Sequence, residues 1–592
     1  MAYISKRDRR REKERQNATK NRRELIEAGF SRRDLIKMGL VTSAGMLIPK
    51  SGLSARARDP RALVPFDNPQ SPPTTPFVEE MPRIPEATPV VLTPPPQKVA
   101  NTAAGEAPRA PHQRWEEFEA RFGPPVTYQN IAAQTSGHIV HPQLPPQTLF
   151  TYNGQVPGPL FKNFYGQRVV VRYRNNLPLV GFDGFGRGEI STHLHNGHTP
   201  SESDGFPVDF YPAPQYKDHH YPNIRAGYDQ FPETAGDHRE TLNTLWYHDH
   251  RVDFTAQNTY KGLAGMYLLF DELDSNNENA PPPQFGLPSG EFDVPIVFQD
   301  RLFDETTGRL FFDKFNLDGI LGDKFLANGK VQPFFRVRPR KYRFRLLNGG
   351  PSRFYEFFIR DKTANQDIPF TVIANDGNLL PTPVLNQTSI RVAVAERVDI
   401  VVDFTGRVGR NIILQNRLEQ EDGRGPTGDI LPPNEAMEII KFKVELPFTG
   451  DNSRVPPAFR PNPPLEEVAV ERIWRFDRSS GSWTINGQIF DEDVIRATIM
   501  QGTAERWVLQ NNSGGWQHPV HIHFEEFQML TRNGVPPPPV ERGRKDVARL
   551  QFNETVRLFM RFRDFVGRYP MHCHNTVHED HAMMLRWDIV HP

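Results

Sequence analysis

Four short segments of the sequence concentrate side chains that bind metal ions. They are His193-Leu194-His195, His248-Asp249-His250, the run from His518 to His523, and the run from His572 to His578. On a β-strand, residues i and i+2 point to the same face, so a His-x-His pair can present two imidazoles to one metal ion. A single pair is weak evidence, because zinc sites use the same residues. Four such segments in one chain indicate a larger metal centre.

The last segment contains the only cysteine of the chain, Cys573, with a histidine on each side. If this stretch is extended, the thiol points away from its two histidine neighbours, and one peptide segment touches two metal centres. Cys573 with His518, His578 and the thioether of Met583 supplies the two-histidine, one-cysteine, weak-methionine ligand set of a blue copper electron-transfer site. The alternative interpretation, a small buried hydrophobic cysteine, does not account for these neighbours.

On the other side of the same segment, eight imidazoles remain. Eight nitrogen ligands suit three copper ions that share bridging oxygen species, which gives four copper ions in all. The cysteine and its flanking histidines then form a short covalent connection between the two centres. The eight residues are His193, His195, His248, His250, His521, His523, His572 and His574.

A repeated pattern predicts the elements that position these residues. An Asn-Gly turn, an apolar stretch, an alternating strand with arginine and a closing asparagine recur from Asn153 to Asn175, Asn328 to Asn348 and Asn486 to Asn511. Asn-Gly supplies the positive φ of a tight hairpin, and period-two alternation turns one face of each strand inward. We therefore expect an all-β chain of three consecutive Greek-key sandwiches or barrels.

The histidines are distributed unequally among these three copies. No histidine occurs between His250 and His518, so the middle copy has no imidazole to offer a metal ion. We expect the shared site where the first and third domains meet, with the middle domain as a spacer. The predicted domains span residues 112–275, 290–447 and 460–592.

Composition agrees with this class and argues against others. The chain has 592 residues, enough for about three domains of ordinary size. It has 56 prolines and 43 glycines, which suits many short strands and turns. Lys plus Arg and Asp plus Glu both number 71, so no net field attracts nucleic acid or an anionic membrane.

The N-terminal region resembles a twin-arginine export signal. Arg32-Arg33 precedes the apolar stretch from Met38 to Ile48, which is too short to span a bilayer, and Ala55-Arg56-Ala57 offers a small-residue cleavage pattern. We therefore expect a signal over residues 1–58, use of the twin-arginine machinery, a periplasmic or secreted location in a bacterium, and no stable membrane anchor. Residues 59–111 are rich in proline and predict an extended tether.

In order and spacing, the four histidine segments resemble the copper signatures of multicopper oxidases over nearly the whole chain after the tether. The sequence is similar to that of the branch containing bilirubin oxidases and bacterial spore-coat laccases in three stretches, Trp246 to His250, Thr259 to Gly265 and His578 to Met584. The sequence departs from the family at Asn196, where glycine usually follows His-x-His. The resemblance implies three cupredoxin-like domains and an oxidase that couples a small-molecule reductant to dioxygen.

The resemblance also implies how the ligands divide among one type 1, one type 2 and two type 3 copper ions. His193 and His521 are expected at type 2, and the type 1 set is the cysteine group named above. The type 3 pair is expected to use His195, His248, His250, His523, His572 and His574.

Three further residues match family positions near the metal ions. Asp204 and Glu579 are expected to relay protons for dioxygen reduction, although a turn residue and a solvated surface charge are the alternatives. Trp516, two residues before His518, is expected beside the electron-accepting edge of type 1 or in the core. The reductant could be a phenol, an aminophenol or a tetrapyrrole such as bilirubin.

Other functions remain as alternatives. A metallo-oxidase acting on Mn(II) or Cu(I) would share the mechanism, although the twelve methionines form no cluster for Cu(I). A copper-free structural relative is disfavoured because every ligand position is filled, and a two-domain nitrite reductase because there are three repeats. The remaining histidines singled out, expected to be supporting or surface groups, are His198, His219, His220, His238 and His581.

Overall fold

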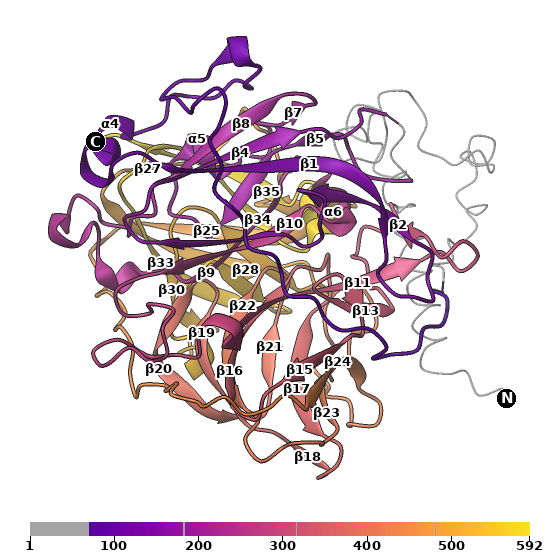
Figure 1. Ribbon diagram of the computed structural model, residues 1–592. Coiled ribbons are helices and arrows are strands. Elements are labelled where there is room, and N and C mark those ends of the chain that lie inside the picture. The colour runs from indigo at the N-terminus through magenta and orange to yellow at the C-terminus, as the bar shows by residue number, and fades with distance from the viewer. Residues whose placement is uncertain (1–69, 181–183, 315, 480) are drawn as a thin grey trace, which may run out of the picture.

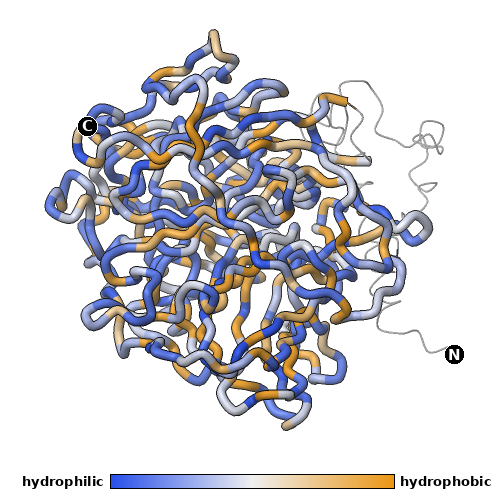
Figure 2. The backbone as a smooth tube through the Cα atoms, in the orientation of Figure 1, coloured by the Kyte–Doolittle hydropathy of each residue, from blue (hydrophilic) through white to orange (hydrophobic). Residues whose placement is uncertain are grey.

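The computed structural model describes residues 70–180, 184–314, 316–479 and 481–592, which form three β-domains in chain order (Figure 1). The expected export signal lies outside the described residues. Hydrophobic and hydrophilic stretches alternate at short intervals along the backbone, as strands with one buried face require (Figure 2). The expectation of an all-β chain is confirmed.

The first domain pairs two four-stranded sheets, ordered β2-β1-β4-β8 and β3-β10-β9-β6. Their inner faces enclose a core rich in tyrosine, including Tyr152, Tyr173 and Tyr247. The strands are β1 Val126–His138, β2 Gln147–Tyr152, β3 Gly158–Phe164, β4 Val169–Asn175, β6 Thr192–His195, β8 Tyr216–Tyr221, β9 Thr244–Asp249 and β10 Ala264–Phe270, with the small pair β5 Glu189–Ile190 and β7 Tyr211–Pro212 beside them.

The second domain has the larger sheets, one following β14-β13-β11-β16-β22-β19-β20 and the other β15-β24-β23-β17-β18. Its strands are β11 Asp293–Phe303, β12 Leu310–Phe311, β13 Lys324–Ala327, β14 Lys330–Val331, β15 Phe334–Val337, β16 Lys341–Asn348, β17 Tyr355–Asp361, β18 Gln366–Asp367, β19 Phe370–Asn375, β20 Asn378–Gln387, β21 Ile390–Val392, β22 Arg397–Asp403, β23 Ile412–Asn416 and β24 Met437–Val444.

The third domain pairs the sheets β26-β25-β28-β33-β30-β31 and β27-β35-β34-β29-β32. Its strands are β25 Val468–Ser479, β26 Ser482–Ile485, β27 Ile495–Met500, β28 Thr503–Asn511, β29 His518–Ile522, β30 Phe527–Arg532, β31 Arg544–Lys545, β32 Val547–Leu550, β33 Thr555–Phe562, β34 Gly567–Cys573 and β35 Met584–Val590.

Helices are short and connect strands. No helix among the described residues is long and apolar enough to cross a membrane. The helices are α4 Trp115–Phe122, α5 Ser201–Asp204, α6 Thr255–Lys261 and α7 Thr576–Asp580, and the 3₁₀ turns are η2 Thr102–Ala104, η3 Pro232–Thr234, η4 His238–Glu240, η5 Gly290–Phe292 and η6 Pro539–Glu541.

The closing asparagine of the repeat has the same role in all three domains. Asn175, Asn348 and Asn511 are buried, and each side chain donates to two backbone carbonyls and accepts from the amide two residues later. Each satisfies a buried turn that follows its strand. In the third domain, one of the two carbonyls is that of Trp516, so Asn511 fixes the loop that leads to His518.

The proline-rich segment from residue 70 to residue 111 is extended, but it is not a free tether. Met81 donates to the carbonyl of Phe334 in the second domain, and Ala87 to that of Leu160 in the first. The Met81 side chain lies in the core of the second domain. The apolar residues between the prolines hold the segment against two domains.

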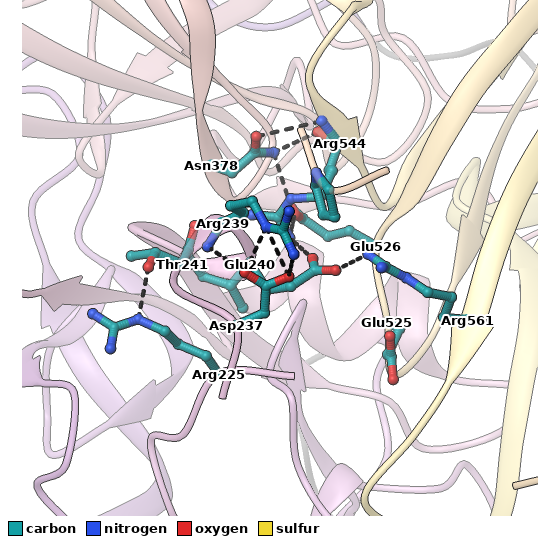
Figure 3. A network of polar contacts seen from close by, with 12 residues as sticks. Arg225, Asp237, Arg239, Glu240, Thr241, Asn378, Glu525, Glu526, Arg544 and Arg561 are labelled. Carbon is teal, nitrogen blue, oxygen red and sulfur yellow. Dashed lines mark hydrogen bonds and ion pairs between the residues drawn. The ribbon is translucent and has the colours of Figure 1, made fainter. Parts of the chain in front are cut away.

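A buried ionic cluster joins the first and third domains. Glu240 accepts from Arg544 at 2.7 Å and from Arg563 at 2.9 Å, and it also contacts Arg561 (Figure 3). Burial opposes ionisation of Glu240, but the three guanidinium groups outweigh it and lower the pKa of the carboxyl to about 2. This carboxylate is therefore charged in the folded protein and fixes the interface at which the histidine-bearing strands meet.

The Glu240→Gln variant should lose about 3–5 kcal/mol of unfolding free energy at neutral pH, because three buried cations lose their shared anion. The folded pKa lies below the ordinary value of 4.5, so the contribution is complete above that value and is lost as the pH falls towards 2. Chemical denaturation across this pH range measures both effects. Glu272→Gln, which removes a carboxylate whose side chain is 59% exposed beside Arg225, is the control and should change little. Equal losses in both variants would contradict the prediction.

Candidate metal centres

Two pairs of strands carry the histidines to one place. In the first domain, β6 and β9 align His193 with His248. In the third domain, β29 and β34 align His521 with His572. All eight imidazoles predicted on this side of Cys573 are buried. The structure therefore brings them together between the first and third domains.

The eight rings form three groups whose nitrogen atoms converge, and His195 belongs to two of them. His195, His248 and His574 form one group, and His250, His523 and His572 form a second. The Nε2 atoms of His250 and His523 each lie 3.2 Å from that of His572. In the third group, the Nε2 atoms of His193 and His521 lie 3.4 Å apart.

The outer nitrogen of most rings is held by a fixed acceptor, so the inner nitrogen faces the centre. Nδ1 of His193 lies 2.6 Å from the carbonyl of Asp204, and Nδ1 of His521 lies 2.9 Å from that of Asp546. Nδ1 of His248 lies 2.9 Å from the carbonyl of Asp249. An Nδ1–H donated outward leaves the Nε2 lone pair for a metal ion.

Burial disfavours the charged form of several of these imidazoles, and a metal ligand must be neutral. Burial lowers the pKa of His250, His518 and His574 to about 3, and neighbouring imidazoles add to the effect at His250 and His574. Nitrogen atoms of His195, His248 and His574 are buried without a hydrogen-bond partner. Unpaired buried acceptors are costly, and a metal ion bound by the group would satisfy them. The donor set therefore fits copper or another imidazole-binding metal.

A second centre forms around Cys573, which is completely buried. Its Sγ lies 3.5 Å from Nδ1 of His518 and 3.6 Å from Nδ1 of His578, and those two nitrogen atoms lie 3.2 Å apart. Two imidazoles and one thiol at the corners of a triangle match the trigonal set of blue copper sites. Burial raises the pKa of the thiol, so metal binding must displace its proton.

Met583 is held beside this triangle. Its backbone amide donates to the carbonyl of His578, and its carbonyl accepts from the amide of Cys573, both at 3.0 Å. Its side chain is buried in the core of the third domain with Cys573. Its role as a weak ligand stays a prediction.

Both predicted carboxylates contact the histidine groups. Asp204 Oδ2 lies 2.7 Å from Nδ1 of His523. Glu579 lies between two rings, with Oε2 at 3.0 Å from Nδ1 of His572 and Oε1 at 3.3 Å from Nδ1 of His250. Burial opposes ionisation of Glu579, but its close contacts with the two rings, a hydrogen bond with His572 among them, lower the pKa of the carboxyl to about 2. Neither carboxylate is solvated, and their role in proton transfer stays a prediction.

Trp516 lies near the Cys573 centre, beneath two guanidinium groups. Arg424 lies 4.4 Å and Arg478 lies 4.9 Å from the centroid of its ring. Its Nε1 donates to Oδ1 of Asp318 at 3.1 Å, and Nε of Arg424 lies 3.2 Å from Oδ2 of the same carboxylate. These residues come from the second and third domains.

Two residues of this site could not be found from spacing. The carbonyl of Asp318 accepts from Nε2 of His578 at 3.0 Å, so the second domain contributes to the site and is more than a spacer. Trp483 places its ring centroid 3.9 Å from that of His578. Asp318 lies in a loop far from every motif, and a tryptophan near an Asn-Gly turn is ordinarily a core residue.

The other histidines lie outside the groups described. His198 pairs with Asp564 at 2.8 Å, His219 and His220 are buried in the first domain, His581 contacts the carbonyl of Val577, and His238 is exposed. Asn196 adopts φ +69°, a left-handed conformation that asparagine tolerates better than most residues. Its side chain donates to Glu526 at 2.8 Å, which fixes the turn after His195 to the third domain.

Comparison with known proteins agrees with this geometry. Two sequence profiles described as multicopper oxidase match residues 134–274 and 462–591. The chain is 34% identical to a bilirubin oxidase of Albifimbria verrucaria over 473 residues, which covers 78% of this chain and 76% of that protein. It is 32% identical to a laccase of Bacillus subtilis over 526 residues, which covers 79% and 95%.

Solved structures share the fold. The McoA multicopper oxidase from Aquifex aeolicus matches with a TM-score of 0.63 at 27% identity, and the match covers 78% of this chain and 96% of that chain. A laccase from Pediococcus acidilactici matches with a TM-score of 0.68 at 24% identity over 88% and 96%. The sequence profiles and the two relatives above 30% identity give the family: the chain belongs to the multicopper oxidases and is a copper oxidase of the laccase and bilirubin oxidase type.

Proposed function

We propose that this protein removes single electrons from an organic aromatic reductant at the Cys573 centre and reduces dioxygen to two waters at the histidine groups, with four copper ions. When bound, copper supplies one-electron redox chemistry at the first centre and dioxygen binding at the second. The convergence of eight buried imidazoles, most of them anchored at the outer nitrogen, beside a two-histidine, one-cysteine triangle carries this proposal.

We assign the ligands as the family resemblance implies, and the groups are compatible with this assignment. Cys573, His518, His578 and Met583 hold type 1; His193 and His521 hold type 2; the type 3 ions are held by the group of His195, His248 and His574 and the group of His250, His523 and His572. Cys573 lies between two of these ligands in the chain. An electron accepted at the thiolate therefore has a covalent route to both type 3 groups.

The surroundings of Trp516 support an organic, anionic aromatic reductant. The side chain of Arg424 is 23% exposed, whereas that of its partner Asp318 is 1% exposed. The Arg424 guanidinium, whose Nε also lies 3.9 Å from Asp422, is the charged group of this pair that meets solvent, and it can pair with a phenolate or a carboxylated aromatic. Mn(II) needs oxygen ligands, and the Asp318 carboxylate is buried beneath the guanidinium.

Metal analysis and a substrate screen test this function. We expect a blue protein with four copper ions per chain and a higher kcat/KM for a phenol carboxylate or bilirubin than for Mn(II) or Cu(I). Arg424→Gln should lower kcat/KM for the anionic donors more than for a neutral phenol. Zinc in place of copper, a colourless copper-loaded protein or a preference for the metal ions would contradict the proposal.

The axial ligand gives a separate prediction. Met583→Leu should raise the type 1 reduction potential, because a weak donor that favours Cu(II) is lost while the volume is nearly unchanged. A redox titration of the blue band measures the shift. Met584→Leu is the matched control, and an equal shift there would move the axial assignment to its neighbour.

Export is proposed from the sequence alone. The Arg32-Arg33 pair before a short apolar stretch supports a receptor-read address. Arg32→Lys with Arg33→Lys should retain the protein in the cytoplasm of a bacterial host, which fractionation and an activity assay would reveal. Unchanged activity outside the cytoplasm would contradict the signal.

A further inference from the structure

Neither imidazole of the Cys573 centre reaches the surface. His518 and His578 are both 0% exposed. Nε2 of His518 lies 2.9 Å from Oγ of Ser513, and Nε2 of His578 lies 3.0 Å from the carbonyl of Asp318. A reductant in solution therefore cannot touch either ring, and its electron must cross protein to reach them.

Trp483 lies against the innermost part of this route. Its ring centroid is 3.9 Å from that of His578, with 34° between the planes, and 5.6 Å from that of His518. The residue is 0% exposed, and its Nε1 donates to the carbonyl of Leu317 at 2.9 Å. The hydrogen bond and the surrounding core hold the indole in contact with the imidazole.

Trp516 continues the route outward. Its ring centroid lies 5.2 Å from that of Trp483, with 77° between the planes, an edge-to-face contact. Hydrogen bonds at both ends fix it, from its Nε1 to Asp318 and from Asn511 to its carbonyl. Trp516 is 8% exposed, so along this route it is the ring that a reductant beside Arg424 can approach.

We propose that Trp483 and Trp516 form the path by which electrons pass from the reductant to His578, so that Trp483 is a coupling residue of this oxidase. The inference rests on the proposed copper site at Cys573. Electron tunnelling weakens steeply across saturated groups and empty space. Two indoles in contact fill most of the space between the reductant and His578.

The step balances without oxidising either indole. A phenolic reductant loses one electron, and its proton goes to water. The electron reduces the copper(II) ion proposed at Cys573 to copper(I), and dioxygen is the final acceptor. The two tryptophans are unchanged at the end of the step, because they couple the reductant to the copper ion electronically and neither ring is oxidised.

A competing route would pass through Asp318, whose carbonyl contacts His578 and whose carboxylate contacts Trp516. The two routes diverge at Trp483, which makes this residue the test. Trp483→Leu removes the aromatic ring, and Trp483→Phe keeps a smaller one. Trp474→Leu is the matched control, since Trp474 is a buried tryptophan of the same domain that contacts Trp507.

The experiment uses the copper-loaded full chain. Anaerobic stopped-flow bleaching of the blue band by a phenol carboxylate measures electron uptake, redox titration measures the type 1 potential, and dioxygen reoxidation measures the later steps. Trp483→Leu should bleach roughly tenfold more slowly, equivalent to about 1.4 kcal/mol in activation free energy. Trp483→Phe should be intermediate and Trp474→Leu unchanged. The potential and the reoxidation rate should stay at wild-type values in all three variants.

Three results would overturn the inference. Wild-type bleaching of Trp483→Leu would assign the path to Asp318, and a change of potential large enough to explain slow bleaching would reduce Trp483 to a structural role. If Trp483→Leu does not fold, Trp483→Phe must still bleach more slowly than the wild type, and wild-type bleaching there would refute the path. A wild-type protein without a blue band would contradict the proposed function itself, which separates the two failures.

Discussion

Cys573→Ser should abolish the blue colour and reduce substrate oxidation by at least about 10³-fold, equivalent to about 4 kcal/mol in activation free energy. The thiol is the soft, ionisable donor of the triangle, and its Sγ lies 3.5 and 3.6 Å from Nδ1 of His518 and His578. A serine hydroxyl is a hard donor that stays protonated at neutral pH, so the triangle loses its affinity for copper. Metal analysis should find one copper ion per chain fewer.

The histidine groups should survive this substitution, because the other ligands do not depend on the thiol. Reduced variant protein should therefore still react with dioxygen. Val520→Ala is the packing control, since Val520 lies opposite Cys573 in the β29–β34 register and is equally buried. Loss of all copper from Cys573→Ser, or loss of colour from Val520→Ala, would contradict two separable centres.

Asp204→Asn and Glu579→Gln should slow reoxidation by dioxygen about 10- to 100-fold, the usual cost of losing a partner of a metal ligand. The two oxygen atoms of Glu579 lie beside Nδ1 of His572 and Nδ1 of His250, whereas an amide offers one oxygen and turns a donor towards the other ring. Dioxygen reduction also consumes protons, and these carboxylates contact the histidine groups directly. The defect should therefore grow as the pH rises.

Stopped-flow reoxidation of copper-replete protein across pH measures this effect. The blue band and its reduction by substrate should stay at wild-type values, because the Cys573 centre is separate. Glu525→Gln is the control, since this buried carboxylate pairs with Arg563 and contacts no proposed ligand. Wild-type reoxidation rates in both variants would return Asp204 and Glu579 to structural roles.

Local periodicity explains which parts of the site the sequence could predict. The sequence predicts the pairs His193 with His195 and His572 with His574, because strand geometry alone places residues i and i+2 on one face. The opposite side chain between the second pair, Cys573, followed from the same rule. The three Asn-Gly turns, which adopt positive φ at Asn153, Asn328 and Asn486, were readable for a similar reason.

The sequence does not predict contacts that arise only when domains pack against each other. Asp318 reaches His578 from another domain, and no spacing relates the two residues. Glu240 meets Arg544, Arg561 and Arg563 across an interface, and its sequence neighbours give no sign of it. The prolines around Met81 predict a tether, whereas the few apolar residues of this segment determine where it binds.

The division of the histidine groups between two distant parts of the chain bears on how the protein avoids the wrong metal. Domains generally fold from the N-terminus during synthesis, so His193, His195, His248 and His250 stand together before the third domain exists. Alone they are an incomplete set of imidazole ligands that zinc as well as copper can occupy, because imidazole suits both ions. Selectivity arises only when the cysteine-bearing strand docks and completes the groups. Binding of the correct metal therefore depends on the order in which the domains assemble. Free zinc present during folding should inhibit the enzyme more than zinc added to the folded enzyme.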